Sequence, residues 1–184
     1  MSRLRFVAAK DLFATFPTAI GDVGVEPSEE LSLDFIKMLS DRRDLRAGLS
    51  FCAYLLPRRE AVWWGCRCLR QTDQLRHEED VQIAAAEAWV REPDESNRLH
   101  AVDRGTKGNT KSSGTWVCLA AGWAGGTLPM MTQIPVVVPQ HLTAQAVRVA
   151  LILASQAFPA GERVAMQCRW LAEGVHIAQT GPVQ

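Results

Sequence analysis

Apolar residues recur three and four positions apart in nearly every patterned segment of this chain. Successive residues of an α-helix are about 100° apart, so residues with this spacing share one helical face. The segment after Asp44 is one example, with apolar residues in register at Leu45, Leu49, Cys52 and Leu56. Strand patterns are nearly absent, and only 136–138 is expected to be extended. The sequence therefore predicts an all-α fold of about eight or nine helices, with stacked helical hairpins as one candidate arrangement.

The length of the chain limits the number of domains. At 184 residues it has the size of one domain, and such a domain buries about 70% of its unfolded surface. We expect residues 1–27 to form an N-terminal short helix and loop, in which the helix ends at Pro17 and a glycine-rich loop covers 21–27. Residues 28–184 are expected to form a single helical domain.

One predicted helix, over residues 57–70, carries two adjacent tryptophans. Pro57 suits its first turn, because the N–H that proline lacks would have no partner there. Trp63 and Trp64 must face different ways, since they are about 100° apart on the helix. Trp64 is in line with small and apolar residues and is therefore expected in the core. These residues are Ala61, Gly65 and Cys68.

Trp63 is in line with basic residues instead. They lie one helical turn before it and one and two turns after it, at Arg59, Arg67 and Arg70. This cationic stripe is open to two interpretations. It is a docking surface for another protein, or it is a set of guanidinium groups that cover a half-buried ring.

An acidic segment follows the tryptophan helix. We expect a helix over 77–92 that turns one apolar face inward, formed by Val81, Ala84, Ala85, Ala88 and Trp89. Its acidic residues, with those of the turn after it, are Glu78, Glu79, Asp80, Glu87, Glu92, Asp94 and Glu95. Either they neutralise the neighbouring basic helix, or they form an exposed patch for a basic partner.

The charge of the whole chain excludes some partners. Its formal net charge is zero at pH 7, so the chain has no global basic field that would attract nucleic acid or an anionic membrane. The N-terminus lacks the apolar region of a signal peptide.

The uncharged stretch 112–147 is interrupted by glycines and prolines, which argues against a membrane span. We expect a soluble, cytoplasmic protein that binds neither nucleic acid nor membrane, with 112–147 forming core or an apolar contact surface.

Metal and cofactor chemistry finds little support. Five cysteines, an odd number, do not suggest a disulfide framework. Cys66 and Cys68 are two positions apart, so on a helix they point about 200° from one another and cannot chelate one ion. His77 begins a sequence like the H-E-x-x-H metalloprotease motif, but Val81 replaces the second histidine. We therefore expect no metal and no cofactor.

Catalytic residues are equally hard to find. The loop over 105–112 faintly resembles a phosphate-binding loop, but Thr110 stands where that motif needs glycine. His100 and Asp103 are three residues apart on a predicted short helix and could form a base with the group that orients it. No nucleophile has a matching context. We expect a protein without catalytic residues, with an enzyme using His100 and Asp103 as a remaining alternative.

Several strings of residues together resemble one family. They are 56–64, Ala88-Trp89-Val90 with Pro93 and Glu95, 122–126, and 135–139 followed by 142–147. The resemblance covers roughly 35–180 and is to an uncharacterised all-helical bacterial family whose members occur among type VI secretion accessory and cargo genes. Within it we see a similarity to an immunity protein of a nuclease-type toxin. The shared strings are structural and transfer no catalytic residue.

The resemblance implies that the partner is a cognate toxin or a secretion cargo protein. Our first hypothesis is a non-enzymatic immunity protein that binds and neutralises a nuclease-type toxin through the acidic 77–95 region and the cationic stripe. A nuclease needs a basic groove for phosphates, which an acidic surface can cover. The alternative is an adaptor or chaperone for type VI cargo that acts through the uncharged 112–147 surface. The sequence does not predict the oligomeric state.

Overall fold

The computed structural model describes residues 4–72, 75–128 and 136–180, and within these ranges it contains ten helices and two short strands. The helices are α1 (Ala9–Thr15), α2 (Thr18–Val23), α3 (Ser32–Asp41), α4 (Leu45–Leu55), α5 (Arg58–Leu69), α6 (His77–Arg91), α7 (Glu95–Thr106), α8 (Ser113–Gly122), α9 (Leu142–Ser155) and α10 (Ala160–Thr180). The strands β1 (Thr127–Leu128) and β2 (Val136–Val137) pair antiparallel. The all-α prediction is confirmed.

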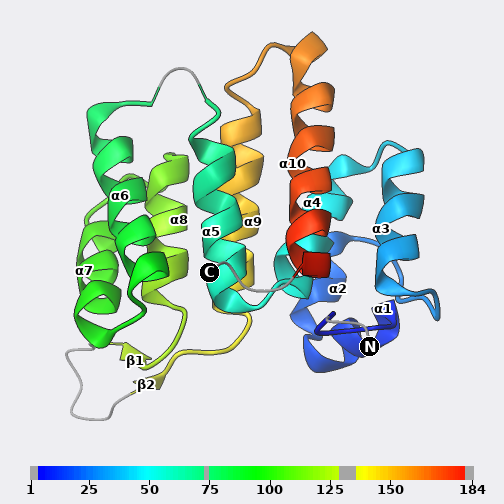
Figure 1. Cartoon of the computed structure of the whole chain (residues 1–184), viewed down its shortest axis with the longest axis horizontal. Helices are drawn as coiled ribbons and strands as arrows, with labels where there is room; N and C mark the ends of the chain where they lie inside the picture. Colours follow the sequence, from blue (N-terminus) through cyan, green and yellow to red (C-terminus); the bar gives the residue numbers. More distant parts are fainter. Residues whose placement is uncertain (1–3, 73–74, 129–135, 181–184) are drawn as a thin grey trace.

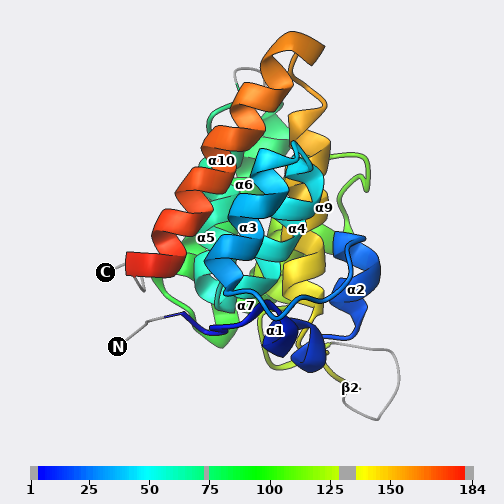
Figure 2. The ribbon, with the colours of Figure 1, turned by 90° about the vertical axis from the view of Figure 1, so that its right-hand side faces the viewer.

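The long helices form a bundle in which α4, α5, α8 and α9 occupy the middle (Figure 1). Helix α8 packs against α6, α7 and α9, while α5 packs against α6 and α9. Helix α10 lies along α4 and α5, as Figures 1 and 2 show. Helices α1 to α3 gather at the end of the bundle opposite α6 and α7. Consecutive helices from α5 to α8 are neighbours in space, as stacked hairpins require.

Trp64 lies at the centre of the core and is fully buried. Its indole N–H donates a hydrogen bond to the backbone oxygen of Trp170 on α10, at 2.8 Å. Gly174, one turn further along α10, lets the two helices approach closely, because a Cβ there would lie 2.8 Å from the Trp64 ring. The predicted core positions of Trp64 and Cys68 are confirmed.

The N-terminal segment contains one more helix than the sequence predicts. Residues 21–23, expected in a loop, belong to α2, which ends at Gly24 in the left-handed conformation with φ 72°. Phe13 of α1 packs against Phe35 and Phe51, with ring centroids 5.9 and 5.6 Å away. The first two helices therefore contribute to the same core as α3 and α4.

Helix α6 buries a wider arc than its apolar spacing predicts. Ala84 is exposed, so its expected inward position is wrong, and Gln82 is buried instead. The Gln82 amide oxygen accepts a hydrogen bond from the Thr115 hydroxyl of α8 at 3.2 Å. Because α6 contacts α5, α7 and α8 together, a polar residue facing α8 is buried and satisfied there.

The uncharged stretch forms core for most of its described length. Helix α8 buries nearly every residue, and α9 buries the face that meets α8. Val136 and Val137 are extended as predicted, and Val137 is exposed. Residues 129–135 of the stretch lie outside the described part of the chain. Among the helices that the structure describes, none combines the length and apolar character needed to cross a membrane.

The close approach of α10 to α5 gives a first test. We expect Gly174→Ala to lower the free energy of unfolding by about 1–3 kcal/mol, because its methyl group would press on Cys52 and Trp64. Gly161→Ala, at the start of the same helix, is the matched control, since a Cβ there meets nothing within 4 Å. Urea unfolding measures both. Equal stabilities of the two variants would contradict the packing argument.

Candidate functional site

The cationic stripe and the acidic helix meet along the interface between α5 and α6. Arg70, at the end of α5, makes two hydrogen bonds of 2.9 Å to the carboxylate of Glu87. It also forms an ion pair with Asp80. The bonds to Glu87 raise the pKa of Arg70 above its ordinary value. One end of the predicted stripe is thus bound to the acidic helix within the fold.

Most of the other predicted acidic residues are also bonded within the fold. Asp94 caps α7 by accepting a hydrogen bond from the backbone N–H of Asn97 at 2.7 Å. Glu95 makes a two-bond ion pair with Arg98, at 2.7 and 2.6 Å. Within the described ranges, only Glu78 and Glu92 of the predicted acidic set have side chains without a hydrogen-bond or ion-pair partner. Five of the seven predicted acidic side chains are thus bonded within the fold, but only Asp80 and Glu87 are paired with the basic helix α5.

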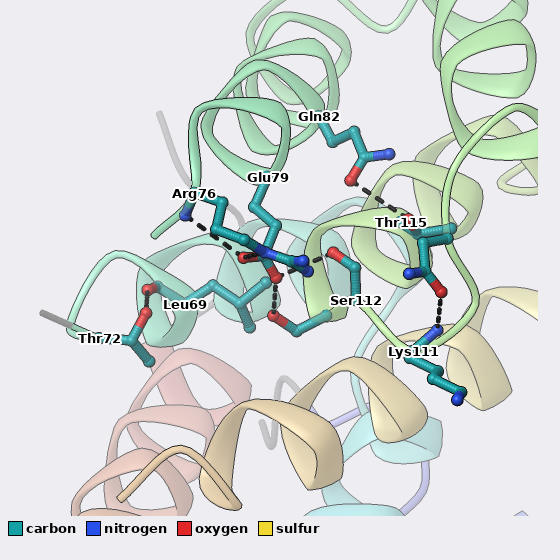
Figure 3. Close-up of polar contacts among 10 residues, drawn as sticks. Leu69, Thr72, Arg76, Glu79, Gln82, Lys111, Ser112 and Thr115 are labelled. Carbon is teal, nitrogen blue, oxygen red and sulfur yellow. Dashed lines mark hydrogen bonds and ion pairs between the residues drawn. The ribbon is translucent and has the colours of Figure 1, made fainter. Parts of the chain in front are cut away.

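Glu79 ties the start of α6 to the loop before α8 (Figure 3). Its carboxylate accepts hydrogen bonds from the hydroxyls of Ser112 and Ser113, at 2.8 and 3.3 Å, and from Arg76 at 3.2 Å. Burial alone would raise the pKa of Glu79, but the bonds from Ser112 and Arg76 outweigh it and hold the pKa below its ordinary value of 4.5. Glu79 is therefore a structural residue.

The remaining residues of the stripe keep donors that the fold does not use. The Nε of Arg59 donates to the backbone oxygen of Val90 at 2.7 Å. The Nε of Arg67 binds Glu173 on α10, and its guanidinium lies 5.0 Å from the centre of the Trp63 ring. Among the described residues, no hydrogen-bond acceptor meets the terminal nitrogens of either arginine.

These residues line an open pocket of about 300 Å³ between α5 and α6. Arg59, Trp63 and Arg67 come from α5, and Arg91 comes from the last turn of α6. Three further residues complete the lining, namely Cys66, Glu87 and Val90. Cys66 and Val90 are buried, so the pocket has an apolar floor beneath cationic walls. Burial raises the pKa of the Cys66 thiol, which keeps it unreactive at neutral pH.

A second pocket, of about 520 Å³, contains the candidate catalytic pair. His100, Asp103 and His77 all line it, together with Glu78 and Lys107 among others. Asp103, however, forms an ion pair with Lys107 at 2.7 Å, and this partner lowers the pKa of Asp103. His100 accepts a long hydrogen bond of 3.4 Å from Arg104. The carboxylate that would orient His100 as a base is therefore bound to another residue.

The thiols and carboxylates of the described residues form no metal centre. No group of three or more histidine, cysteine, aspartate or glutamate residues among them is placed to hold an ion. All five cysteines are free, and Cys168 alone is exposed. Cys66 and Cys68 are both buried on α5.

A comparison with protein-family models matches residues 35–178 to a family of unknown function, DUF6931. The chain belongs to this family. The DUF6931 match extends from α3 to α10 and includes every residue of the α5–α6 pocket. No curated protein and no solved structure matches the chain. The family description names no activity, so the type VI resemblance stays a prediction.

Sequence reasoning missed Arg91 and Glu173 at this site. Arg91 lies one helical turn after Glu87, which places both on one face of α6, so the spacing could have indicated it. Glu173 is 106 residues from Arg67, and no local pattern joins the two. The structure brings together Arg59, Trp63 and Arg67 as the stripe predicts, while Arg70 turns to Asp80 and Glu87.

The bonds to Glu79 give a test with a pH dependence. We expect Glu79→Gln to lower the free energy of unfolding by about 1–2 kcal/mol at pH 7. The pKa of Glu79 is lower in the folded than in the unfolded state, so its charge stabilises the fold above the unfolded pKa. This contribution is lost as the pH falls through the folded pKa. Urea unfolding should therefore show the difference between wild type and variant shrinking as the pH falls below 4.5.

Glu78→Gln is the matched control, because Glu78 is the preceding residue and is exposed. Its side chain has no partner among the described residues, so its replacement should change the stability little at either pH. A Glu79→Gln variant as stable as Glu78→Gln at pH 7 would contradict the assigned role.

Proposed function

We propose that this protein acts by binding another protein and performs no chemistry itself. The α5–α6 pocket carries this proposal, because an indole, cationic walls and a buried apolar floor meet there. Aromatic and arginine side chains of this kind dominate the binding energy of protein interfaces. The best catalytic candidate, His100, lacks the orienting carboxylate that a base would need.

The resemblance to type VI genes supports a partner from that system. The protein is then an immunity protein that binds and neutralises a cognate toxin of the nuclease type, and the similarity to the immunity protein TsiT points in this direction. Because most of the acidic 77–95 region is bonded within the fold, we place the contact on the cationic pocket instead. Metal-dependent nucleases carry carboxylates in their active sites, and arginine side chains pair with carboxylates.

The use of the acidic side chains inside the fold also favours a second candidate. An adaptor or chaperone for type VI cargo needs a surface complementary to its cargo. It does not need an acidic surface that covers the phosphate-binding groove of a nuclease. For such a role the exposed Val136 and Val137 of β2 offer apolar surface within the uncharged stretch 112–147. The two candidates therefore differ in what binding does to the partner.

Co-expression with the protein encoded by the adjacent gene separates the candidates. An immunity protein should form a stable complex and restore growth of cells that the partner poisons. We expect Arg91→Glu to weaken this protection, while Arg42→Glu, on the exposed turn after α3, should not. A stable complex without rescue would favour the adaptor, and the lack of any complex would contradict both.

The hypothesis that the acidic 77–95 region contacts the partner has a separate test. Charge reversal of the two unpartnered carboxylates, Glu78→Lys and Glu92→Lys, should leave binding and rescue unchanged. A loss of binding in these variants comparable with that of Arg91→Glu would restore the acidic region as the contact surface.

A further inference from the structure

The α5–α6 pocket offers more hydrogen-bond donors than the fold uses. The terminal nitrogens of Arg59 and Arg67 meet no acceptor among the described residues, and the same is true of the whole Arg91 guanidinium. The indole N–H of Trp63 is also without an acceptor among them. Arginine nitrogens form a planar fork that matches a carboxylate with two parallel hydrogen bonds. Donors of this kind, gathered around one space, indicate an anionic ligand.

The charge around the pocket is only partly neutralised. Three arginines line it, and Glu87 is the acidic residue of the lining. Both oxygens of Glu87 are bonded to Arg70, which lies outside the lining. Glu173 pairs with Arg67. Arg59 and Arg91 are therefore the cations that a bound anion would neutralise.

The size and surroundings of the pocket select the kind of anion. A space of about 300 Å³ has room for one or two side chains. Nucleic acid is bound by a track of cations along several phosphates, whereas Glu87 lines this site and Glu173 is paired with one of its arginines, Arg67. A polyanion would be repelled by these carboxylates, but a single carboxylate between the arginines would not. The exposed part of the Trp63 ring and the apolar floor suit an apolar neighbour of that carboxylate.

We infer that the pocket binds an aspartate or glutamate side chain from a short segment of a partner protein, with an adjacent apolar residue packed against Trp63. This inference rests on the proposed function, since it requires a protein partner, and it adds the chemistry of the bound segment. The carboxylate lies between Arg59 and Arg91, and the apolar residue covers the floor formed by Cys66 and Val90.

Short peptides test the inference without the natural partner. The probe is the acetylated and amidated hexapeptide Gly-Leu-Glu-Glu-Leu-Gly, and its control carries glutamine in place of both glutamates. Binding is followed through the indole N–H resonance of Trp63 in the full chain, assigned with Trp63→Phe. We expect a saturable shift with the glutamate peptide and binding at least about tenfold weaker with the glutamine peptide. Equal binding of both peptides, or binding of neither, would overturn the inference.

Two variants and two competing anions complete the experiment. Arg91→Glu should weaken peptide binding by about tenfold or more, and Arg42→Glu is the matched charge reversal that should not. Arg91 is exposed and has no partner among the described residues, so the fold should tolerate its replacement; Arg91→Gln is a milder second variant. Inorganic phosphate and a twelve-nucleotide single-stranded DNA are the competitors. If either bound as tightly as the glutamate peptide, the pocket would be a phosphate site and the inference would be wrong.

The failure of this inference can be told from the failure of the proposed function. A natural complex that persists with Arg91→Glu and Arg91→Gln would reject the pocket and leave the binding role in place. Peptide binding without any natural complex would keep the pocket chemistry and reject the type VI partner.

Discussion

The burial of Trp64 fixes the rotation of α5, and the rest of the site depends on that rotation. Its indole N–H is bonded to the carbonyl of Trp170, and Gly174 brings α10 close enough to cover the ring. Because the next residue on a helix is about 100° away, Trp63 cannot follow Trp64 into the core. It faces the side where α6 packs, together with Arg59 and Arg67. The cationic pocket is thus the outer face of the helix that anchors the core.

The arginines of this interface fall into two groups that differ in how much of each guanidinium the fold uses. Arg70 binds Glu87 with two bonds and Asp80 with a third contact, so it joins α5 to α6. Arg59 and Arg67 each donate only the Nε to a hydrogen-bond acceptor of the fold, although the Arg67 guanidinium also lies over the Trp63 ring, and Arg91 has no hydrogen-bond or ion-pair partner among the described residues. The unused guanidinium nitrogens form no hydrogen bond with the described residues and so remain available to a ligand. The difference is the physical ground for separating structural from binding residues.

The sequence predicts which segments form helices better than it predicts which residues those helices contact. The helical spacing and the Trp63–Trp64 step place one indole in the core and one at the surface, because both depend only on local geometry. The inward position of Ala84 is wrong, since α6 meets three helices and buries Gln82 against Thr115. The pairing of Arg67 with Glu173 spans 106 residues and follows from tertiary packing alone. Which charges remain free is therefore a property of the whole fold and not of any segment.

Net charge is a poor guide to the partner of this chain. A chain with zero net charge has no long-range field of one sign, yet a pocket only a few residues wide can still be cationic. The acidic side chains of 77–95 are numerous in the sequence, but caps and ion pairs use most of them locally. Arg91 is a cation in this acidic helix, and its guanidinium has no partner among the described residues. Complementarity in such a protein is decided by the few groups that folding leaves unpaired, and in the α5–α6 pocket these are donors.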